Sequence, residues 1–364
     1  MGKIKQNSEP FLPIVAIPPG ESIKECMEAL DMTQTELALR LSITPKHLGD
    51  ILKGNSAITY ETALKLESVI GPSAEFWINL EGNYQLDKAR IEENKRLIED
   101  YNILKEIPYN EMSKLGWVEG TRNKNERVKN SREFFKVSML TAITNSYAVA
   151  FRLNKTKNAI SDYGVLAWLI EAENLGSKVE VERLNRSKLK KMIPEFRKLT
   201  LETPEIFYPK MKQLCAECGI ALVLVESLPK TYICGATVWK GEKAILALSV
   251  RGKKADIFWF TFFHELAHLV EHNRKEFHIN YGECDKEEDE ADSLARNYLI
   301  SDDIYNDFLN NYNYEDLNSI KRYANKISIA PCILVGRLLH DKIIDYSMKY
   351  DSLRPSFKIV RSSN

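Results

Sequence analysis

Residues 260–272 read FTFFHELAHLVEH, and this stretch decides the fold we expect for the second half of the chain. It contains the sequence His-Glu-Leu-Ala-His at 264–268. On a helix, residues four apart lie one turn above each other on the same face. His264 and His268 therefore offer two imidazole nitrogens to one metal ion, and Glu265 projects beside them to handle the proton of a water. We predict a metal site here.

Histidines are concentrated around this stretch. A buried amphipathic helix that happens to hold two histidines would give the same local pattern. Four of the six histidines of the chain, however, lie within residues 264–278, at positions 264, 268, 272 and 278. This concentration favours the metal site, and the motif favours hydrolysis of a peptide bond.

An acidic segment downstream supplies the candidates for a third ligand. A catalytic zinc takes three protein ligands and leaves one position open. Residues 287–300 read EEDEADSLARNYLI, and their apolar spacing is typical of a helix. We predict Glu288 as the third ligand, with Glu290 as the competing candidate. Acidic side chains at the start of a helix can also simply be stabilised by the positive end of the helix dipole. This does not explain Asp292, which lies one turn after Glu288 and which we expect to orient a ligating histidine.

The two segments together resemble the ImmA/IrrE family of metallopeptidases, because HELAH is followed by EDEAD at 288–292. The segments GATVW at 235–239, AILALSV at 244–250 and VGRLLH at 335–340 extend the resemblance. The family usually has Phe where Leu294 stands, and Leu keeps this position apolar. The resemblance implies a zincin-like domain with a zinc cofactor, although nitrogen and oxygen donors also accept manganese.

Three apolar runs around this motif predict a small sheet. They cover residues 220–225, 232–239 and 243–250, with a turn at 240–242. We expect the sheet to pack on the metal-binding helix. A peptide substrate could bind to an edge strand of this sheet through backbone hydrogen bonds. The alternative is that the hairpin only covers the helix.

Five short helical patterns occupy the amino-terminal region, at about residues 21–30, 33–41, 44–53, 59–69 and 76–86. Thr33, Thr44 and Thr59 stand where N-caps are expected, and Glu36 completes a capping box with Thr33. Pro45 suits the first turn of the third helix. Such helices could form an ordinary bundle, which is the simpler interpretation.

Residues 33–59, TQTELALRLSITPKHLGDILKGNSAIT, resemble the XRE-type helix-turn-helix, and residues 18–90 as a whole resemble HigA-type antidote proteins. The resemblance implies a module that places its second helix in the major groove of operator DNA. Exposed positions that could reach base edges are Thr44, Lys46 and His47. Candidates for phosphate contacts are Gln34, Lys53 and Asn55.

The charge of this region limits its affinity for DNA. Residues 1–90 hold nine basic and twelve acidic side chains, a net charge of −3. Non-specific affinity depends on cations that neutralise phosphates. We therefore expect the module to gather its few cations on one face and to bind paired half-sites as a homodimer.

Length and composition restrict the remaining possibilities. A chain of 364 residues favours more than one domain, and 44% hydrophobic with 28% charged residues is typical of a folded protein. The formal net charge is zero, so no overall field attracts nucleic acid or membrane. No apolar run is long enough to cross a bilayer, and the start of the chain lacks an apolar signal core, so we expect a cytoplasmic protein with no membrane partner. The six cysteines are scattered along the chain, as expected for reduced thiols.

The middle of the chain carries no sharp motif. We predict a helical connector over residues 91–203, between the DNA-binding domain at 1–90 and the peptidase domain at 204–364. Its basic stretches at 122–132 and 183–191 are typical of solvated helix faces, although such runs can also contact DNA or an acidic partner. The lone pair Cys215 and Cys218 is expected to pack in the core.

Together these patterns predict an α+β, mostly helical fold with an amino-terminal five-helix bundle, a helical connector and a zincin-like domain. The expected function is transcriptional regulation joined to zinc-dependent cleavage of a regulatory protein, such as a repressor or antitoxin partner. The alternative is a non-catalytic antitoxin that represses its own operon and binds a toxin, with a dormant or structural metal site. Glu265 favours chemistry, because a structural zinc needs no general base.

Overall fold

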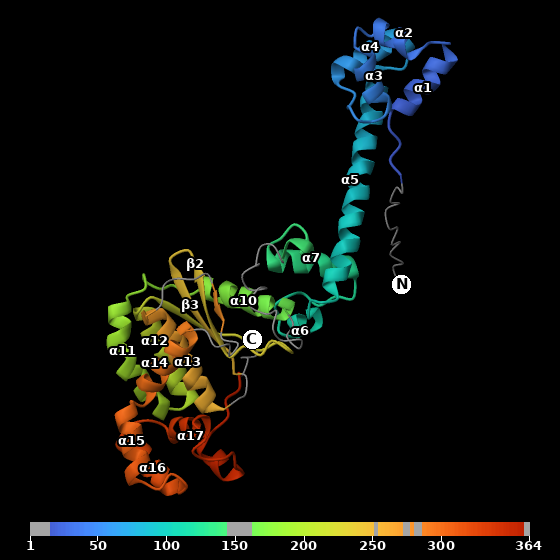
Figure 1. Ribbon diagram of the computed structural model, residues 1–364. Helices are drawn as coiled ribbons and strands as arrows, with labels where there is room; N and C mark the ends of the chain where they lie inside the picture. Colours follow the sequence, from blue (N-terminus) through green and yellow to red (C-terminus); the bar gives the residue numbers. More distant parts are fainter. Residues whose placement is uncertain (1–14, 144–161, 251–253, 272–276, 280–285, 360–364) are drawn as a thin grey trace, which may run out of the picture. The chain divides into compact units, whose positions relative to one another are not determined.

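The computed structural model describes residues 15–143, 162–250, 254–271, 277–279 and 286–359 of the chain (Figure 1). These residues belong to two compact units, residues 1–101 and residues 102–364. Helices predominate, and the second unit also contains a small sheet. The predicted α+β, mostly helical class is therefore confirmed. Within the described ranges, no helix has the length and apolar character needed to span a bilayer.

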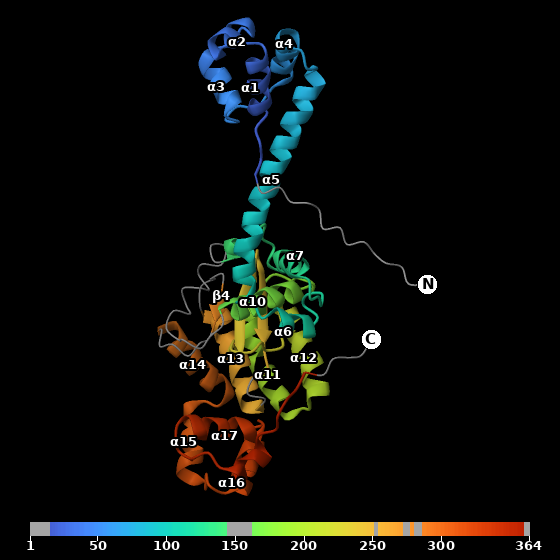
Figure 2. The ribbon, with the colours of Figure 1, turned by 90° about the vertical axis from the view of Figure 1, so that its right-hand side faces the viewer.

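Five helices form or begin in the first unit, as the sequence predicts (Figures 1 and 2). They are α1 (Gly20–Ala29), α2 (Gln34–Arg40), α3 (Pro45–Leu52), α4 (Tyr60–Ile70) and α5 (Ala74–Leu104). The last of them is much longer than the predicted segment, which ended at residue 86. Apolar spacing predicts a helix only where one face is buried, and α5 has few buried residues beyond its first turns.

Threonine N-caps start three of these helices. The Oγ1 atoms of Thr33, Thr44 and Thr59 each accept a hydrogen bond from a backbone N–H three residues later, at 3.1–3.2 Å. The side chain of Glu36, predicted to complete a capping box, accepts a hydrogen bond from Arg40. Gly54 follows α3 with a φ of +72°, a conformation that favours glycine.

One apolar core holds the first unit together. Leu37, Leu48, Leu66 and Trp77 are fully buried in it. Glu81 of α5 is also buried, and its carboxylate accepts a hydrogen bond from the backbone N–H of Ile58 at 3.1 Å. This bond satisfies a buried donor and fixes the loop before α4.

The second unit contains the remaining helices and the strands of the described residues. Its α-helices are α6 (Tyr109–Lys114), α7 (Lys124–Phe135), α10 (Asp162–Ser177), α11 (Arg186–Lys198), α12 (Pro204–Glu217), α13 (Ala255–Glu271), α14 (Lys286–Leu299), α15 (Asp302–Asn311), α16 (Leu317–Lys326) and α17 (Pro331–His340). Short 3₁₀ helices are η1 (Leu140–Ala142), η2 (Leu199–Leu201) and η3 (Met348–Leu353). The strands are β1 (Ile220–Leu224), β2 (Gly235–Lys240), β3 (Lys243–Leu248) and β4 (Phe277–Ile279).

The strands form one mixed sheet in the order β1-β3-β2-β4. β1 pairs parallel with β3, whereas β2 pairs antiparallel with both β3 and β4. The tight turn between β2 and β3 contains Gly241, whose φ is +58°. Among the described strands, β1 and β4 are therefore the edges of the sheet, and the predicted hairpin of β2 and β3 is central.

Both faces of the sheet are covered by helices (Figures 1 and 2). Leu222, Leu246 and their alternating neighbours share a core with α13, as predicted. Val223, Ile245 and their alternating neighbours share a second core with α10. Side chains of a strand alternate between faces, so a strand buried on both sides is apolar throughout.

The helix α10 lies in the region expected to be a connector. Its run GVLAWLI is buried, and the indole N–H of Trp168 donates a hydrogen bond to the carbonyl of Val225 at 3.3 Å. The described residues from 102 to 203 belong to the second unit. They are thus part of its packed structure, and the domain boundaries drawn from the sequence stay predictions.

Three further features noted in the sequence are the cysteine pair, the basic stretch at 122–132 and the histidines near the metal site. Cys215 and Cys218 are both fully buried in the core, as expected. The basic stretch at 122–132 coincides largely with α7, where Arg127 stacks on the ring of Tyr109 at 4.9 Å. His272 lies outside the described residues, and of His278 only the backbone in β4 is described.

Candidate functional site

The helix α13 holds the first two predicted ligands rigidly. It is buried along almost its whole length, and Phe262, Phe263 and Leu266 pack into the core around it. His264 and His268 lie on one face of this helix, and both are almost completely buried. A buried histidine pair on a fixed helix is pre-organised, because little side-chain motion remains to be lost when a ligand binds.

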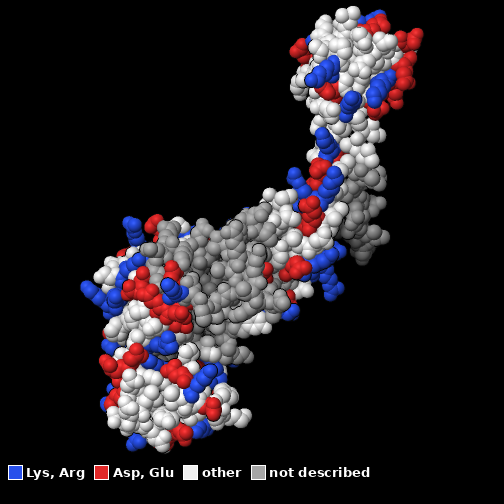
Figure 3. Space-filling model, viewed as in Figure 1, with Lys and Arg blue, Asp and Glu red and all other residues white. Residues whose placement is uncertain are grey.

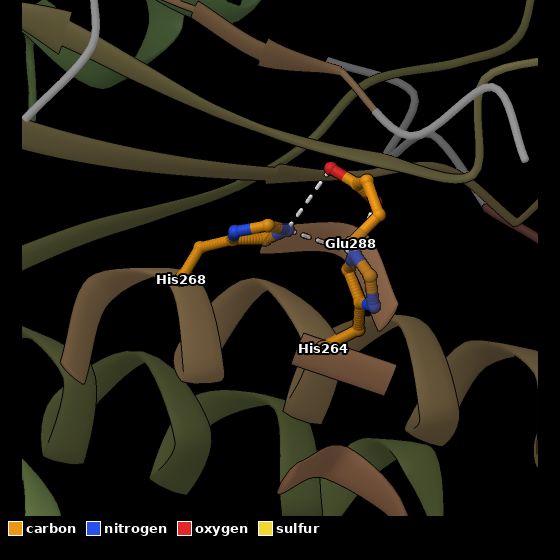
Figure 4. Close-up of side chains that lie close together, drawn as sticks. All are labelled: His264, His268 and Glu288. Carbon is orange, nitrogen blue, oxygen red and sulfur yellow. Dashed lines mark hydrogen bonds and ion pairs between the residues drawn. The ribbon is translucent and has the colours of Figure 1, made fainter. Parts of the chain in front are cut away.

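Glu288 of α14 meets these histidines, and the three side chains converge (Figure 4). The two Nε2 atoms of His264 and His268 lie 2.9 Å apart. The Glu288 carboxylate oxygens lie 3.1 Å from Nε2 of His264 and 3.3 Å from Nε2 of His268. Donor atoms around a tetrahedral zinc, at bond lengths of about 2.0–2.1 Å, would lie about 3.3 Å apart. The donor set therefore fits a zinc ion in both chemistry and spacing.

Asp292 lies behind the first histidine. Its Oδ1 atom is 2.7 Å from Nδ1 of His264. A proton on Nδ1 that is donated to this carboxylate leaves the Nε2 lone pair free to face the other two donors. The structure thus brings Asp292 to the position that the sequence predicted for an orienting carboxylate.

Electrostatics couples the histidines to the carboxylates. Burial disfavours the charged form of His264, but its hydrogen bonds to Asp292 and Glu288 outweigh this effect and raise its pKa. Burial also disfavours ionised Glu288, and the same histidines more than compensate, so its pKa lies below the ordinary value. A metal ion at this place would replace the protons that the histidines otherwise share.

Glu265 is also buried, and β2 holds it. Its Oε2 atom accepts a hydrogen bond from Oγ1 of Thr237 at 2.8 Å. A Cβ atom at Gly235 would lie 2.5 Å from Cγ2 of Thr261 and 3.2 Å from Cγ of Glu265, so only glycine fits there. Burial raises the pKa of the Glu265 carboxyl above its ordinary value, which suits a group that must accept a proton near neutral pH.

The competing third ligand is placed differently. Glu290 is exposed on α14, whereas Glu288 lies on the face of that helix that meets the histidines. The side chain of Glu288 is 20% exposed and that of Asp292 is 39% exposed. The site therefore reaches solvent on its α14 side.

The predicted DNA-contacting residues are all exposed in the first unit. Thr44, Lys46 and His47 lie at the start of α3, with Lys53 and Asn55 just after its end. Thr44 also caps α3, because its hydroxyl oxygen accepts the N–H of His47. The Thr44 oxygen can accept this hydrogen bond while its hydroxyl hydrogen is donated to another acceptor, such as a DNA base.

Gln34 has a structural contact that its sequence position does not predict. Its side-chain amide donates a hydrogen bond to the carbonyl of Pro45 at 3.1 Å, so it ties α2 to the start of α3. A Cβ atom at Gly49 would lie 3.1 Å from the Gln34 amide nitrogen, so the glycine leaves room for this contact. Gln34 remains exposed and has a second N–H for a phosphate.

Acidic side chains in the first unit gather over α1 (Figure 3). Glu21, Glu25 and Glu28 are exposed on this helix, and exposed Asp31 follows it. The region around α3 instead carries exposed Lys46 and Lys53. A module with a net negative charge can therefore still present cations to DNA at α3.

Thr237 and Gly235 also belong to the site, although the sequence does not predict this. Their segment was noted for its strand pattern and its resemblance, but neither property predicts that residue 237 faces Glu265. The alternation along β2 is the only local signal, since Gly235, Thr237 and Trp239 share a face of the strand.

Comparison with known families identifies two regions of the chain. Residues 23–77 match the helix-turn-helix family, and residues 216–328 match the IrrE N-terminal-like domain family. Over 71 residues the chain is 37% identical to YddM, an uncharacterised HTH-type transcriptional regulator of Escherichia coli (strain K12). This match covers 20% of this chain and 76% of YddM. Over 84 residues it is 32% identical to virulence-associated protein I of Dichelobacter nodosus, covering 23% and 76% of the two chains.

Two solved structures are similar to parts of the chain. An addiction module antidote protein of the HigA family from Coxiella burnetii is 34% identical, and the match covers 24% of this chain and 95% of that chain with a TM-score of 0.22. PA4674 from Pseudomonas aeruginosa, solved with its operator DNA, is 29% identical, with coverage of 21% and 84% and a TM-score of 0.20.

Proposed function

Since the chain belongs to the HTH-type transcriptional regulators and also carries an IrrE N-terminal-like domain, we propose that its second unit is a zinc-dependent endopeptidase that cleaves a regulatory protein partner. The helix-turn-helix and the peptidase-like domain in one chain suit a regulator that removes a repressor or antitoxin partner. The observation that carries the proposal is the convergence of two histidines and one glutamate beside a second, buried glutamate.

His264, His268 and Glu288 would hold the ion. A zinc ion with one open position supplies a water whose pKa falls to about 7, and it polarises the carbonyl of the scissile bond. The same nitrogen and oxygen donors also accept manganese. Asp292 keeps His264 in the tautomer that the site needs.

Glu265 would act as the general base and acid. Its carboxylate takes the proton of the attacking water and then delivers it to the leaving amine. The hydrogen bond from Thr237 occupies one carboxylate oxygen and leaves the other for this proton. Thr237 is thus a positioning residue, because it acts through Glu265.

A peptide substrate could add to the edge of the sheet. β4 is the edge strand beside β2, which holds Thr237. Pairing along β4 would bind a peptide through its backbone.

The test of the peptidase is a Glu265→Gln variant with co-transcribed proteins as substrates. The variant should keep its zinc and lose cleavage by about 10²–10⁴-fold, because only proton transfer is removed. Glu271→Gln is the matched control, since Glu271 lies on the same helix and pairs with Lys190. Equal cleavage by wild type and Glu265→Gln would reject the assignment. Absence of cleavage of any partner by the zinc-loaded wild type would favour the alternative, a non-catalytic antitoxin that binds operator DNA and a toxin.

The first unit is proposed to bind operator DNA as a homodimer, with α3 in the major groove. Its exposed start at Thr44, Lys46 and His47 supports this proposal. Lys46→Ala and His47→Ala should weaken operator binding in a gel-shift assay, each by about 1–3 kcal/mol if it contacts a base. Lys24→Ala, on the acidic helix α1, is the control and should leave the shift unchanged. Unchanged shifts for both α3 variants would reject this recognition helix.

A further inference from the structure

A cavity lies within the second unit, next to the candidate metal site. Its volume is about 270 Å³, just below the lower end of the range for ligand pockets, at about 300 Å³. Three helices, α13, α14 and α17, and the residue Arg354 form its wall. Figure 2 shows these helices in the same unit.

Along two helices, residues that line the cavity lie one turn away from residues of the metal site. On α13, Phe260 lines the cavity one turn before His264, and the centres of their rings are 6.3 Å apart. On α14, Arg296 lines it one turn after Asp292. Residues four apart share a helix face, so a molecule in the cavity would touch the same faces that carry the metal-site residues.

Most of the cavity wall is apolar. The apolar side chains that line it are Ile257, Phe260, Leu299, Ile300, Ile333 and Leu339. An apolar wall of this size favours an aliphatic or aromatic group, because such a group leaves water when it binds.

Two of the arginines at the cavity already have partners. Arg354 donates two hydrogen bonds to Oδ2 of Asp256, at 3.0 and 2.7 Å. Arg337 donates to the carbonyl of Ile300 and to Asp302, and it stacks over Tyr305 at 4.0 Å. These two cations are therefore held by the protein itself.

Arg296 is different. It is half-buried, and within the part of the chain that the structure describes it makes no hydrogen bond or ion pair. A guanidinium at the wall of an apolar cavity is a ready partner for a carboxylate, which it can bind through two parallel hydrogen bonds.

We propose that this cavity binds a small amphipathic carboxylic acid, with its apolar chain between α13, α14 and α17 and its carboxylate on Arg296. The ligand would touch both helices that carry the candidate metal ligands. The site is independent of the peptidase proposed above, and binding can be measured whether or not the protein cleaves anything.

The test uses octanoate and octanol as probes in calorimetric titrations of the full-length protein. Octanoate should bind one site, and more tightly than octanol. Arg296→Gln should weaken octanoate by about ten- to a hundredfold, the range of a hydrogen bond to a charged group, and leave octanol unchanged. Leu339→Trp should fill the cavity and remove binding of both, with Leu339→Phe as a smaller intrusion if the Trp variant does not fold.

Two controls separate the cavity from other sources of binding. Arg322→Gln removes an exposed arginine on α16 and should change neither titration. The titrations are repeated after metal removal by a chelator, because a carboxylate can also bind zinc. Binding that requires zinc, octanoate binding that survives both Arg296→Gln and the filling variants, or no octanoate binding at all would overturn the proposal.

Discussion

The two units hold their candidate functional side chains in different ways. In the first unit these side chains are exposed, and all of them lie within residues 34–55. In the second unit they are mostly buried and come from β2, α13 and α14, which are distant in sequence. A surface that binds DNA needs exposed cations on one short helix, whereas a metal site needs donors that converge from several directions.

This difference shows where each unit is sensitive to substitution. The candidate DNA contacts can change without loss of the fold, because they do not fill the core. The candidate metal site depends on the helices and strands behind it, since a shift of about 1 Å in its supporting groups already disturbs such a site.

Trp168→Ala should have the largest effect. It removes a fully buried indole and its hydrogen bond to Val225, so the free energy of unfolding of the second unit should fall by about 3–5 kcal/mol. Operator binding by the first unit should persist under conditions where the second unit is still folded. Denaturant unfolding followed by circular dichroism measures the loss. A change below about 1 kcal/mol would show that α10 is only a spacer.

Asp292→Asn should weaken zinc binding by about 10–100-fold, because the orienting partner of a ligating histidine is lost. The control is Asp289→Asn, which changes an exposed carboxylate on the same helix. Competition with a chromophoric chelator measures both affinities. If the two variants bind zinc equally, Asp292 does not orient His264.

Gly235→Ala and Gly82→Ala compare the same substitution in the two units. At Gly235 the added methyl group meets Thr261 and Glu265, and overpacking should cost about 1–3 kcal/mol. At Gly82, inside α5, it meets open space and should stabilise the helix by about 0.5–1 kcal/mol. Thermal unfolding of both variants tests the contrast, and a neutral Gly235→Ala would contradict the close packing of β2 on α13.

Thr44→Ala should have the smallest destabilising effect among these variants. Loss of the N-cap hydrogen bond to His47 should cost about 1 kcal/mol in the first unit. Thr35→Ala, inside α2, is the control and should be close to neutral. A thermal melt of the first unit distinguishes them, and equal effects would mean that the cap does not stabilise α3.

The sequence predicts most of the first unit because its signals are local. Caps at Thr33, Thr44 and Thr59, with apolar spacing between them, define helices without reference to distant residues. The length of α5 was not predicted, because residues beyond 86 show no continuous apolar stripe. The hydrogen bond from Gln34 to Pro45 was not predicted either, because it depends on the angle between α2 and α3.

In the second unit the sequence predicts the candidate ligands but not their surroundings. The spacing of His264 and His268 fixes their common face on any helix, and Asp292 follows Glu288 by one turn for the same reason. The roles of Thr237, Gly235 and α10 depend on how the sheet packs against α13 and α10, which no local pattern specifies. Whether Glu288 or Glu290 meets the histidines is likewise decided by how α14 packs on α13.

His264, His268 and Glu288 should together bind one metal ion, and the metal content of the purified full-length protein measures this binding. Wild type, Glu265→Gln and Glu290→Gln should each retain close to one zinc ion per chain by mass spectrometry, whereas His264→Ala and Glu288→Ala should retain almost none while remaining folded. Zinc retained by His264→Ala and Glu288→Ala, or lost from Glu290→Gln, would contradict the account.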